Sequence, residues 1–346
     1  MIKRRYQAGL CLLALLLAGG CSAEPISPPI TPSTLEPRGP NAAYVAQLWW
    51  LMLGLGIAIF VLVIELLSAA LLRRRRATSA TAPETGGDVG RRWLLWGGIA
   101  LPFVVLVIIF GDTIYTLAAI EAPQAQPAFQ IHVVARQWWW QVDYPDQGIT
   151  TANEMHVPVG VPVQIQLESA DVIHSFWVPQ LAGKMDLIPS QVNTITLQSD
   201  QAGVYRGECA EFCGLQHAHM GFMVVAQSQA DFNTWLDAQN KPAIPPTDPA
   251  ARQGQQVFVS AGCVFCHTVR GLDDKSIDRS AIDLGPDLTH LSSRLTIAAA
   301  SLNQNRGNLA GWVLDPQHVK PGAQMPNQYI NSEDLQALLA YLATLQ

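Results

Sequence analysis

Four residues that bind soft metals lie close together between Gly207 and Met220. They are Cys209, Cys213, His217 and Met220. Thiolate, imidazole and thioether ligands suit copper, whereas a hard ion would require a cage rich in carboxylates. Two cysteines separated by three residues can direct both sulfurs into one small space, where two thiolates can bridge a pair of metal ions. The stretch therefore favours a copper site.

Other uses of these residues stay open on spacing alone. Cys209 and Cys213 could form a disulfide in an oxidising compartment, or two cysteines and two histidines could hold a tetrahedral zinc ion. Neither use accounts for Met220, although a methionine after a glycine-containing loop could simply belong to the core. A second copper ion would need another imidazole, and His174 is the candidate, although a lone histidine is more often a hydrogen-bonded surface or core residue.

A second cofactor is indicated by the sequence Cys-Val-Phe-Cys-His at 263–267, the pattern for covalent attachment of haem c. Cys263 and Cys266 can form thioethers with the haem vinyl groups while His267 reaches the iron. A zinc knuckle is the alternative, but the sequence has no second cysteine pair to complete it.

The opposite face of the haem iron needs a ligand, and Met325 is the candidate. It is the only methionine after Met223. Ligation by histidine and methionine raises the reduction potential of a haem. His290 and His318 are the competing candidates and rank behind Met325.

Short strands must hold the copper ligands. Segments 129–134, 161–167, 191–197 and 220–225 read as strands, and the middle two alternate apolar with polar residues. Several strands without intervening helices indicate a sandwich or barrel. The copper stretch then lies on the loop before the last strand. Helices are expected at about 228–239, 249–260 and 332–345, with Ser332 as an N-cap.

Two apolar runs, 48–72 and 93–120, are long enough to cross a membrane, the second interrupted by Pro102 and Asp112. Six arginines lie between the runs, so the positive-inside rule places this connection in the cytoplasm and both flanks outside. Residues 1–21 have the layout of a signal peptide, Cys21 is a candidate lipidation site, and 22–45 form a proline-rich tether. Residues 121–246 hold 12 acidic and 4 basic residues, a balance that could steer a basic partner protein.

Four features together closely resemble cytochrome c oxidase subunit II, from about Tyr44 to Gln239. They are two helices before a sandwich, the sequence Arg-Gln-Trp-Trp-Trp at 136–140, the segment His-Ser-Phe-Trp-Val-Pro at 174–179, and the loop at 209–220. The resemblance implies a cupredoxin-like domain with the binuclear copper centre CuA. Cys209 and Cys213 would then bridge both ions, His174 and His217 would each bind one, and Met220 and the backbone carbonyl of Glu211 would complete them.

The resemblance implies further roles. The side chain of Glu211 would face the catalytic subunit and a magnesium site, and Trp138 would receive electrons from a cytochrome. The family often has a glutamate three residues before Trp93, where this chain has Gly90. Asp88 or Glu84 could substitute, and no proton-uptake role is assigned. Residues 248–346 resemble a class I cytochrome c, with 285–288 as its haem-contacting loop.

We therefore expect a multi-domain membrane protein. Its parts are a two-helix transmembrane hairpin (46–120), an all-β cupredoxin-like sandwich (121–240), a proline-rich linker (241–249) and an all-α class I cytochrome c domain (250–346). Quinol oxidase subunits share the fold without the copper ligands, all of which this chain has. The expected function is electron transfer, as subunit II of a bacterial cytochrome c oxidase, from an external donor through haem c and CuA to the catalytic subunit.

The expected partners are catalytic subunit I and other oxidase subunits, cytochrome c or another electron donor, and the inner membrane, but not nucleic acid. Oxygen reduction would occur on subunit I, in a complex that also translocates protons. Two alternatives remain: a membrane-anchored copper-binding or copper-delivery protein, and an electron donor to a nitrogen-oxide reductase.

Overall fold

The computed structural model describes residues 32–76, 87–121, 127–272 and 284–346, and residues 32–346 form one compact unit. The expected signal peptide, the lipidation site at Cys21, the first part of the tether and Glu84 lie outside the described residues.

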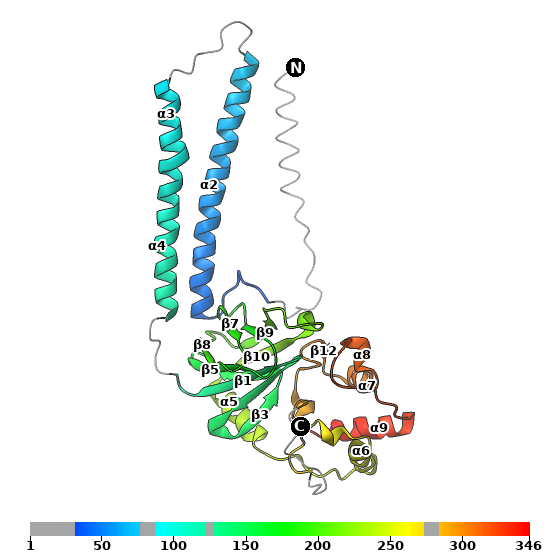
Figure 1. Cartoon of the computed structure of the whole chain (residues 1–346). Coiled ribbons are helices and arrows are strands. Elements are labelled where there is room, and N and C mark those ends of the chain that lie inside the picture. The colour runs from blue at the N-terminus through cyan, green and yellow to red at the C-terminus, as the bar shows by residue number, and fades with distance from the viewer. Residues whose placement is uncertain (1–31, 77–86, 122–126, 273–283) are drawn as a thin grey trace. The chain divides into compact units, whose positions relative to one another are not determined.

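Two long apolar helical segments precede the sandwich (Figure 1). The first is α2 (Pro40–Arg76), and the second runs through α3 (Gly87–Leu95), a π-helical turn (Trp96–Ala100) and α4 (Leu101–Glu121). Both are long and apolar enough to cross a membrane. Tyr44 on α2 contacts Tyr115 on α4 edge to face, with ring centroids 6.5 Å apart. The expected hairpin is confirmed.

The helix boundaries differ from the expected ones at two places. Helix α2 begins at Pro40, within the expected tether, because proline is well suited to a first helical turn, where no N–H is needed. Pro102 does not break the second segment. Pro102 is the second residue of α4, and α4 begins directly after the π-helical turn. The wider winding of that turn accommodates the proline.

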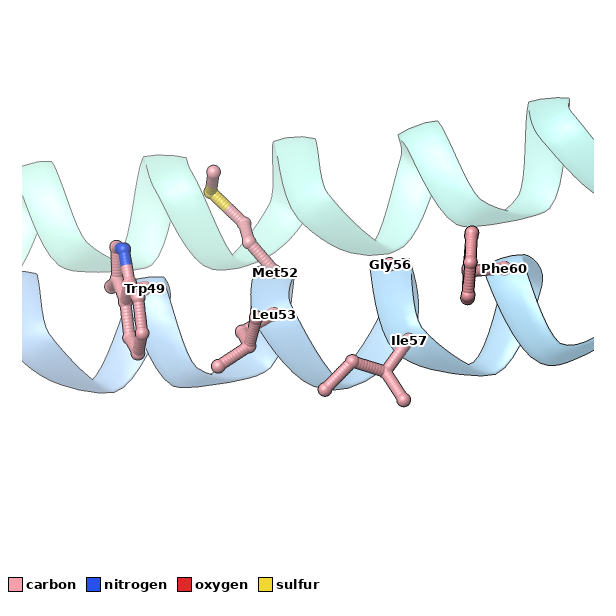
Figure 2. A pocket seen from close by; sticks show the side chains of 6 residues that line it. All are labelled: Trp49, Met52, Leu53, Gly56, Ile57 and Phe60. Carbon is pink, nitrogen blue, oxygen red and sulfur yellow. The ribbon is translucent and has the colours of Figure 1, made fainter. Parts of the chain in front are cut away.

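A shallow apolar pocket of about 390 Å³ lies along α2 (Figure 2). Its lining residues are Trp49, Met52, Leu53, Gly56, Ile57 and Phe60. Gly56 leaves a gap between larger side chains one turn apart, which explains why a depression forms there.

The β-sandwich consists of two five-stranded sheets. The first has the order β3-β2-β1-β5-β8 and the second the order β4-β10-β9-β6-β7. The pairs β1–β5 and β4–β10 are parallel, and the other pairs are antiparallel. The strands are β1 (Gln130–Arg136), β2 (Trp139–Tyr144), β3 (Ile149–Ala152), β4 (Glu154–Pro158), β5 (Val163–Ser169), β6 (His174–Trp177), β7 (Lys184–Leu187), β8 (Asn193–Leu197), β9 (Gly203–Cys209) and β10 (Gly221–Gln227).

The core of the sandwich forms where the inward faces of the two sheets meet. Strands β1, β2 and β5 alternate between buried and partly exposed residues, as strands with one buried face should. Trp140, Phe176 and Phe222 lie in this core, each about 1% exposed. The expected all-β sandwich is confirmed, with the copper loop directly before β10.

The chain after β10 is mainly helical. Helix α5 (Gln229–Gln239) packs on the sandwich core, and the C-terminal domain has α6 (Pro249–Ser260), α7 (Arg306–Leu314), α8 (Pro316–Val319) and α9 (Ser332–Leu342). This domain is helical as expected, but not all-α, because β11 (Thr296–Ile297) and β12 (Leu302–Asn303) form a small two-stranded sheet. Helices α6 and α9 cross so closely that a Cβ on Gly254 would lie 1.9 Å from the carbonyl oxygen of Ala337, so this position requires glycine. One boundary prediction is wrong. The N-cap of α9 is Asn331 rather than Ser332, because the Asn331 side chain accepts the N–H of Asp334.

Candidate copper and haem sites

The copper ligands expected from the sequence converge on one small space around two sulfurs. The Sγ atoms of Cys209 and Cys213 are 3.8 Å apart. His174 Nδ1 lies 3.9 Å from Cys209 Sγ, and the Glu211 carbonyl oxygen lies 3.2 Å from the same sulfur. His217 Nδ1 and Met220 Sδ lie 3.7 and 3.8 Å from Cys213 Sγ. Each cysteine therefore has one imidazole and one further soft or carbonyl ligand beside it.

Pairing of strands β6 and β9 brings the distant His174 to the loop. The register places Phe176 opposite Cys209, so His174, at the start of β6, reaches the end of β9. The loop closes on itself where the N–H of Cys209 donates to the Met220 carbonyl, at 3.1 Å. The N–H of Ala210 donates to the Ser175 carbonyl, at 2.9 Å. A rigid sheet thus holds the ligands, which favours a fixed site.

Three side chains from the aromatic segment donate hydrogen bonds to the backbone of the loop. The side-chain N–H groups of Gln137 and Trp138 donate to the Cys213 carbonyl, at 2.8 and 3.0 Å. Trp140 Nε1 donates to the Met220 carbonyl, at 3.2 Å. Gly214 has φ of +115°, and a Cβ there would lie 3.1 Å from the Trp138 ring. The expected electron-input residue, Trp138, therefore lies directly against Cys213, an expected copper ligand.

Asp171, which the sequence analysis did not single out, contacts one of the expected copper ligands. Its Oδ1 lies 2.8 Å from His174 Nε2, which leaves Nδ1 for a metal ion. Partial burial disfavours ionisation of Asp171, but hydrogen bonds from His174 and from two backbone N–H groups outweigh it and hold its pKa below the usual value. Burial also opposes charge on His174, yet its bonds with Asp171 and Cys209 raise its pKa. The signal in the sequence is an aspartate three residues before the histidine.

The thiol pair fits a cationic metal. A hydrogen bond from the Cys213 thiol lowers the pKa of Cys209 to about 3, while the same pairing and burial raise the pKa of Cys213. Two thiolates so close together repel each other, so the pair by itself keeps one proton. Positive metal charge removes this penalty, and thiolate is the form that binds metal. His174, Cys209 and Cys213 also offer ligand atoms that all lie within 4.8 Å of one another.

We expect the substitution Asp171→Asn to weaken copper binding about 10- to 100-fold, because loss of a carboxylate that orients a ligating histidine typically has this effect. The measurement is copper retained per chain after dialysis against a graded series of chelator concentrations. Asp237→Asn, at an exposed position on α5, is the matched control and should retain copper like the unchanged chain. Equal retention by both variants would show that Asp171 does not orient His174.

The outer rim of the copper loop is exposed and apolar. Phe212 and Leu215 are 75% and 79% exposed, and the side chain of Glu211 is exposed beside them. The Glu211 backbone thus faces the sulfur site while its side chain is free for another contact.

Three of the expected haem ligands lie on and directly after one short turn. Cys263 begins a 3-10 turn (Cys263–Phe265), and Cys266 and His267 follow. His267 Nδ1 lies 2.8 Å from the Pro286 carbonyl oxygen, so Nδ1 donates and Nε2 remains for iron. Burial lowers the pKa of His267, which favours the neutral, ligating imidazole. The backbone at Gly285 approaches the ring so closely that a Cβ there would lie 2.8 Å from it.

The competitors for the second axial position are less suitable than Met325. Both ring nitrogens of His290 face backbone carbonyls, Nδ1 that of Gln346 at 2.7 Å and Nε2 those of Gln239 and Lys241 at 3.1 and 3.0 Å. His318 is exposed on α8, whereas Met325 is partly buried. These contacts therefore indicate a structural role for His290.

Comparisons with known proteins agree with this geometry. Residues 147–227 match the family model described as cytochrome c oxidase subunit II, periplasmic domain, and residues 251–346 match that described as cytochrome c. Cytochrome c oxidase subunit 2 of Alkalihalophilus pseudofirmus is 32% identical over 346 aligned residues, 97% of this chain and 96% of that protein. The chain belongs to the cytochrome c oxidase subunit II family.

Two further proteins are similar to part of this chain. Cytochrome c oxidase subunit 2 of Bacillus sp. PS3 is 34% identical over 79% of this chain and 80% of that protein. The crystal structure of the periplasmic domain of subunit II of the Bradyrhizobium japonicum cytochrome oxidase covers 34% of this chain and 95% of that chain, with 28% identity and a TM-score of 0.32.

Family membership confirms the expected function. This cytochrome c oxidase subunit II carries its own cytochrome c domain and transfers electrons in a haem-copper oxidase. The subunit II domain implies CuA and the cytochrome c domain implies haem c, in agreement with the thiol and imidazole cluster. Its two apolar helices serve as a membrane anchor.

Proposed function

We propose that this subunit conducts electrons from an external donor to catalytic subunit I through two cofactor sites built from the residues above. Haem c and CuA, when bound, each accept and release one electron at a time. The copper site comprises His174, Cys209, the Glu211 carbonyl, Cys213, His217 and Met220, and the haem site comprises Cys263, Cys266, His267 and Met325. The observation that carries the proposal is the convergence of four further donors around one pair of cysteine sulfurs.

The residues of the chain perform distinct tasks in this scheme. The Cys209 and Cys213 sulfurs would balance the charge of bound copper, and Asp171 fixes the ring of His174. The indole of Trp138 links the surface to Cys213 through its hydrogen bond to the Cys213 carbonyl. Trp140 and Phe176 exclude water from the inner side of the site, since both are almost completely buried. A dry, rigid site keeps reorganisation small when an electron arrives.

The magnesium contact, the partner surface and the membrane orientation are proposed from where the residues lie in the structure and in the sequence. The exposed side chain of Glu211 is available to share a magnesium site with subunit I, and the apolar rim of Phe212 and Leu215 suits a protein partner rather than water. The arginines between the two helices support a cytoplasmic connection and therefore copper and haem sites on the outer side of the inner membrane. Proton translocation belongs to the assembled complex.

Copper content relative to haem tests the proposal. In the full-length chain purified in mild detergent, we expect two copper ions per haem and a mixed-valence electron-spin resonance signal shared between both ions. Mild extraction should also recover a multi-spanning subunit with further haems. One copper ion, zinc in place of copper, or a disulfide between Cys209 and Cys213 would contradict the copper assignment while leaving the haem assignment intact.

A further inference from the structure

The cytochrome domain contacts the copper domain directly beside the copper loop, within the one compact unit that residues 32–346 form. Several hydrogen bonds cross this contact, and three of them involve Trp138, Arg206 and Gly221 of the copper domain. The Gly221 N–H donates to the Ala299 carbonyl at 3.0 Å, Arg206 Nη1 donates to the Ala300 carbonyl at 2.9 Å, and Lys320 Nζ donates to the Trp138 carbonyl at 2.8 Å. Gly221 directly follows the copper loop, and Trp138 is the expected electron-input residue. The contact therefore lies at the expected functional surface.

The segment that makes two of these contacts has an unusual backbone. Ala298, Ala299 and Ala300 all have positive φ, between 55° and 57°. Left-handed conformation is unfavourable for alanine at each position and persists only where surrounding contacts impose it. Here each of the three carbonyls accepts a hydrogen bond, the Ala298 carbonyl from Lys320 Nζ at 3.5 Å. The loop is therefore shaped by the surface on which it lies.

Lys320 is a buried amine that the electron-transfer chemistry does not use. Lys320 is only 3% exposed, and burial lowers the pKa of its amine to about 7. The amine bridges the two domains because it donates to Trp138 on one side and to Ala298 on the other. A lysine so deeply buried is rare unless its donors are used.

Residues next to Lys320 extend the contact along the copper loop. Gln216 Nε2 donates to the Pro321 carbonyl at 2.6 Å. A Cβ on Gly322 would lie 3.0 Å from Leu215 Cδ1, so the backbone there touches the apolar rim. Residues 320–322 thus lie against the backbone of Trp138 and the side chain of Gln216, and they touch one end of Leu215, whose side chain otherwise stays exposed.

The linker is hydrogen-bonded to the cytochrome domain that follows it. The Ala243 N–H donates to the Arg270 carbonyl at 2.8 Å, and His290 Nε2 lies 3.0 Å from the Lys241 carbonyl oxygen. The linker is therefore fixed to the cytochrome domain at two points, and it does not act as a free tether.

We propose that Lys320 and the Ala298–Ala300 loop lock the cytochrome domain onto the electron-input surface of its own copper domain, so that a soluble cytochrome cannot bind there. The external donor must then reduce haem c, and copper receives electrons only from within the chain. This inference rests on the proposed relay from haem c to CuA and specifies which partner the Trp138 surface accepts.

Hydrogen exchange at the Gly221 amide tests the lock without depending on activity, because this N–H bonds across the contact to Ala299. In the full-length subunit within the purified oxidase, Lys320→Met should speed exchange about tenfold, since two carbonyls lose their donor, equivalent to about 1.4 kcal/mol in the docking equilibrium. Lys241→Met, at an exposed lysine, is the matched control and should leave exchange unchanged. Arg206→Met should also speed exchange, and it carries the test if Lys320→Met loses haem or copper.

Reduction kinetics with a soluble basic cytochrome c provide the second readout. In the unchanged oxidase, reduction of copper should follow reduction of haem c. In Lys320→Met, an additional copper phase should appear that is first order in soluble cytochrome and independent of haem c. Unchanged Gly221 exchange in both Lys320→Met and Arg206→Met, or direct copper reduction already present in the unchanged oxidase, would overturn the lock.

These outcomes are distinguishable from failure of the proposed function. If copper in the unchanged oxidase is not reduced after haem c, the relay itself is wrong. If the relay operates and Lys320→Met changes neither exchange nor the route of reduction, only the lock is wrong.

Discussion

Replacing Cys213 with serine is expected to abolish the binuclear copper centre and to lower oxygen consumption by more than about a hundredfold, since even the loss of a residue that only orients a ligand costs 10- to 100-fold. Cys213 is the central donor. Its sulfur lies within 3.8 Å of Cys209 Sγ, His217 Nδ1 and Met220 Sδ. A serine hydroxyl stays protonated at neutral pH and cannot bridge two ions as a thiolate does.

The measurements for Cys213→Ser are copper per chain, the electron-spin resonance signal and oxygen uptake by the complex. Haem content should stay unchanged, because Cys263 and Cys266 are untouched. Ala218→Ser is the control, since it adds the same hydroxyl at an exposed position of the same loop. Retention of two copper ions with a shared signal in Cys213→Ser would remove Cys213 from the ligand set.

Replacing Met325 with leucine should keep the haem covalently bound but lower its reduction potential by at least about 0.1 V, because axial ligands control haem potentials over roughly 0.8 V and methionine raises them. Two hydrogen bonds from Gln317 Nε2, to the Ala323 carbonyl at 2.7 Å and to the Met325 carbonyl at 2.8 Å, hold the turn that carries this methionine. Leucine has a similar volume and no sulfur, so the turn should persist without its ligand.

A redox titration of the haem absorbance in the full-length subunit measures this change. Met155→Leu is the control, because Met155 is a buried methionine of the sandwich core with no expected role at the haem. The haem potential of this variant should match that of the unchanged chain. An unchanged potential in Met325→Leu would mean that another residue, with His318 the remaining imidazole, completes the haem.

Much of this architecture follows from patterns that are local in the chain. The apolar runs predict the two helices because a bilayer requires a minimum apolar length. Alternation predicts the strands of the sandwich because side chains on a strand point to opposite faces. Asp248 and Ser228 each cap a following helix with a side-chain oxygen, so the starts of α6 and α5 were predictable to within a residue. The N-cap of α9 was not, because Asn331 and Ser332 are both good caps and only geometry chooses between them.

The copper site was predictable in its chemistry, because Cys209, Cys213, His217 and Met220 share one loop. His174 is different. It is 35 residues from Cys209, and strand pairing between β6 and β9 brings the two together. The resemblance to a known family supplied this ligand before the pairing explained it. Asp171 was missed because its role depends on the direction of the His174 ring, which spacing does not reveal.

Residue types and their local spacing were thus enough to identify two cofactors, a membrane hairpin, a sandwich and a helical domain, because each of these depends on neighbours within a few turns or strands. The contact between the domains was not accessible in this way. Lys320 and Trp138 are 182 residues apart, and neither belongs to a recognisable pattern with the other. Their bond, and the left-handed alanines beside it, exist only because folding buries two surfaces against each other and leaves their polar groups to pair across the contact.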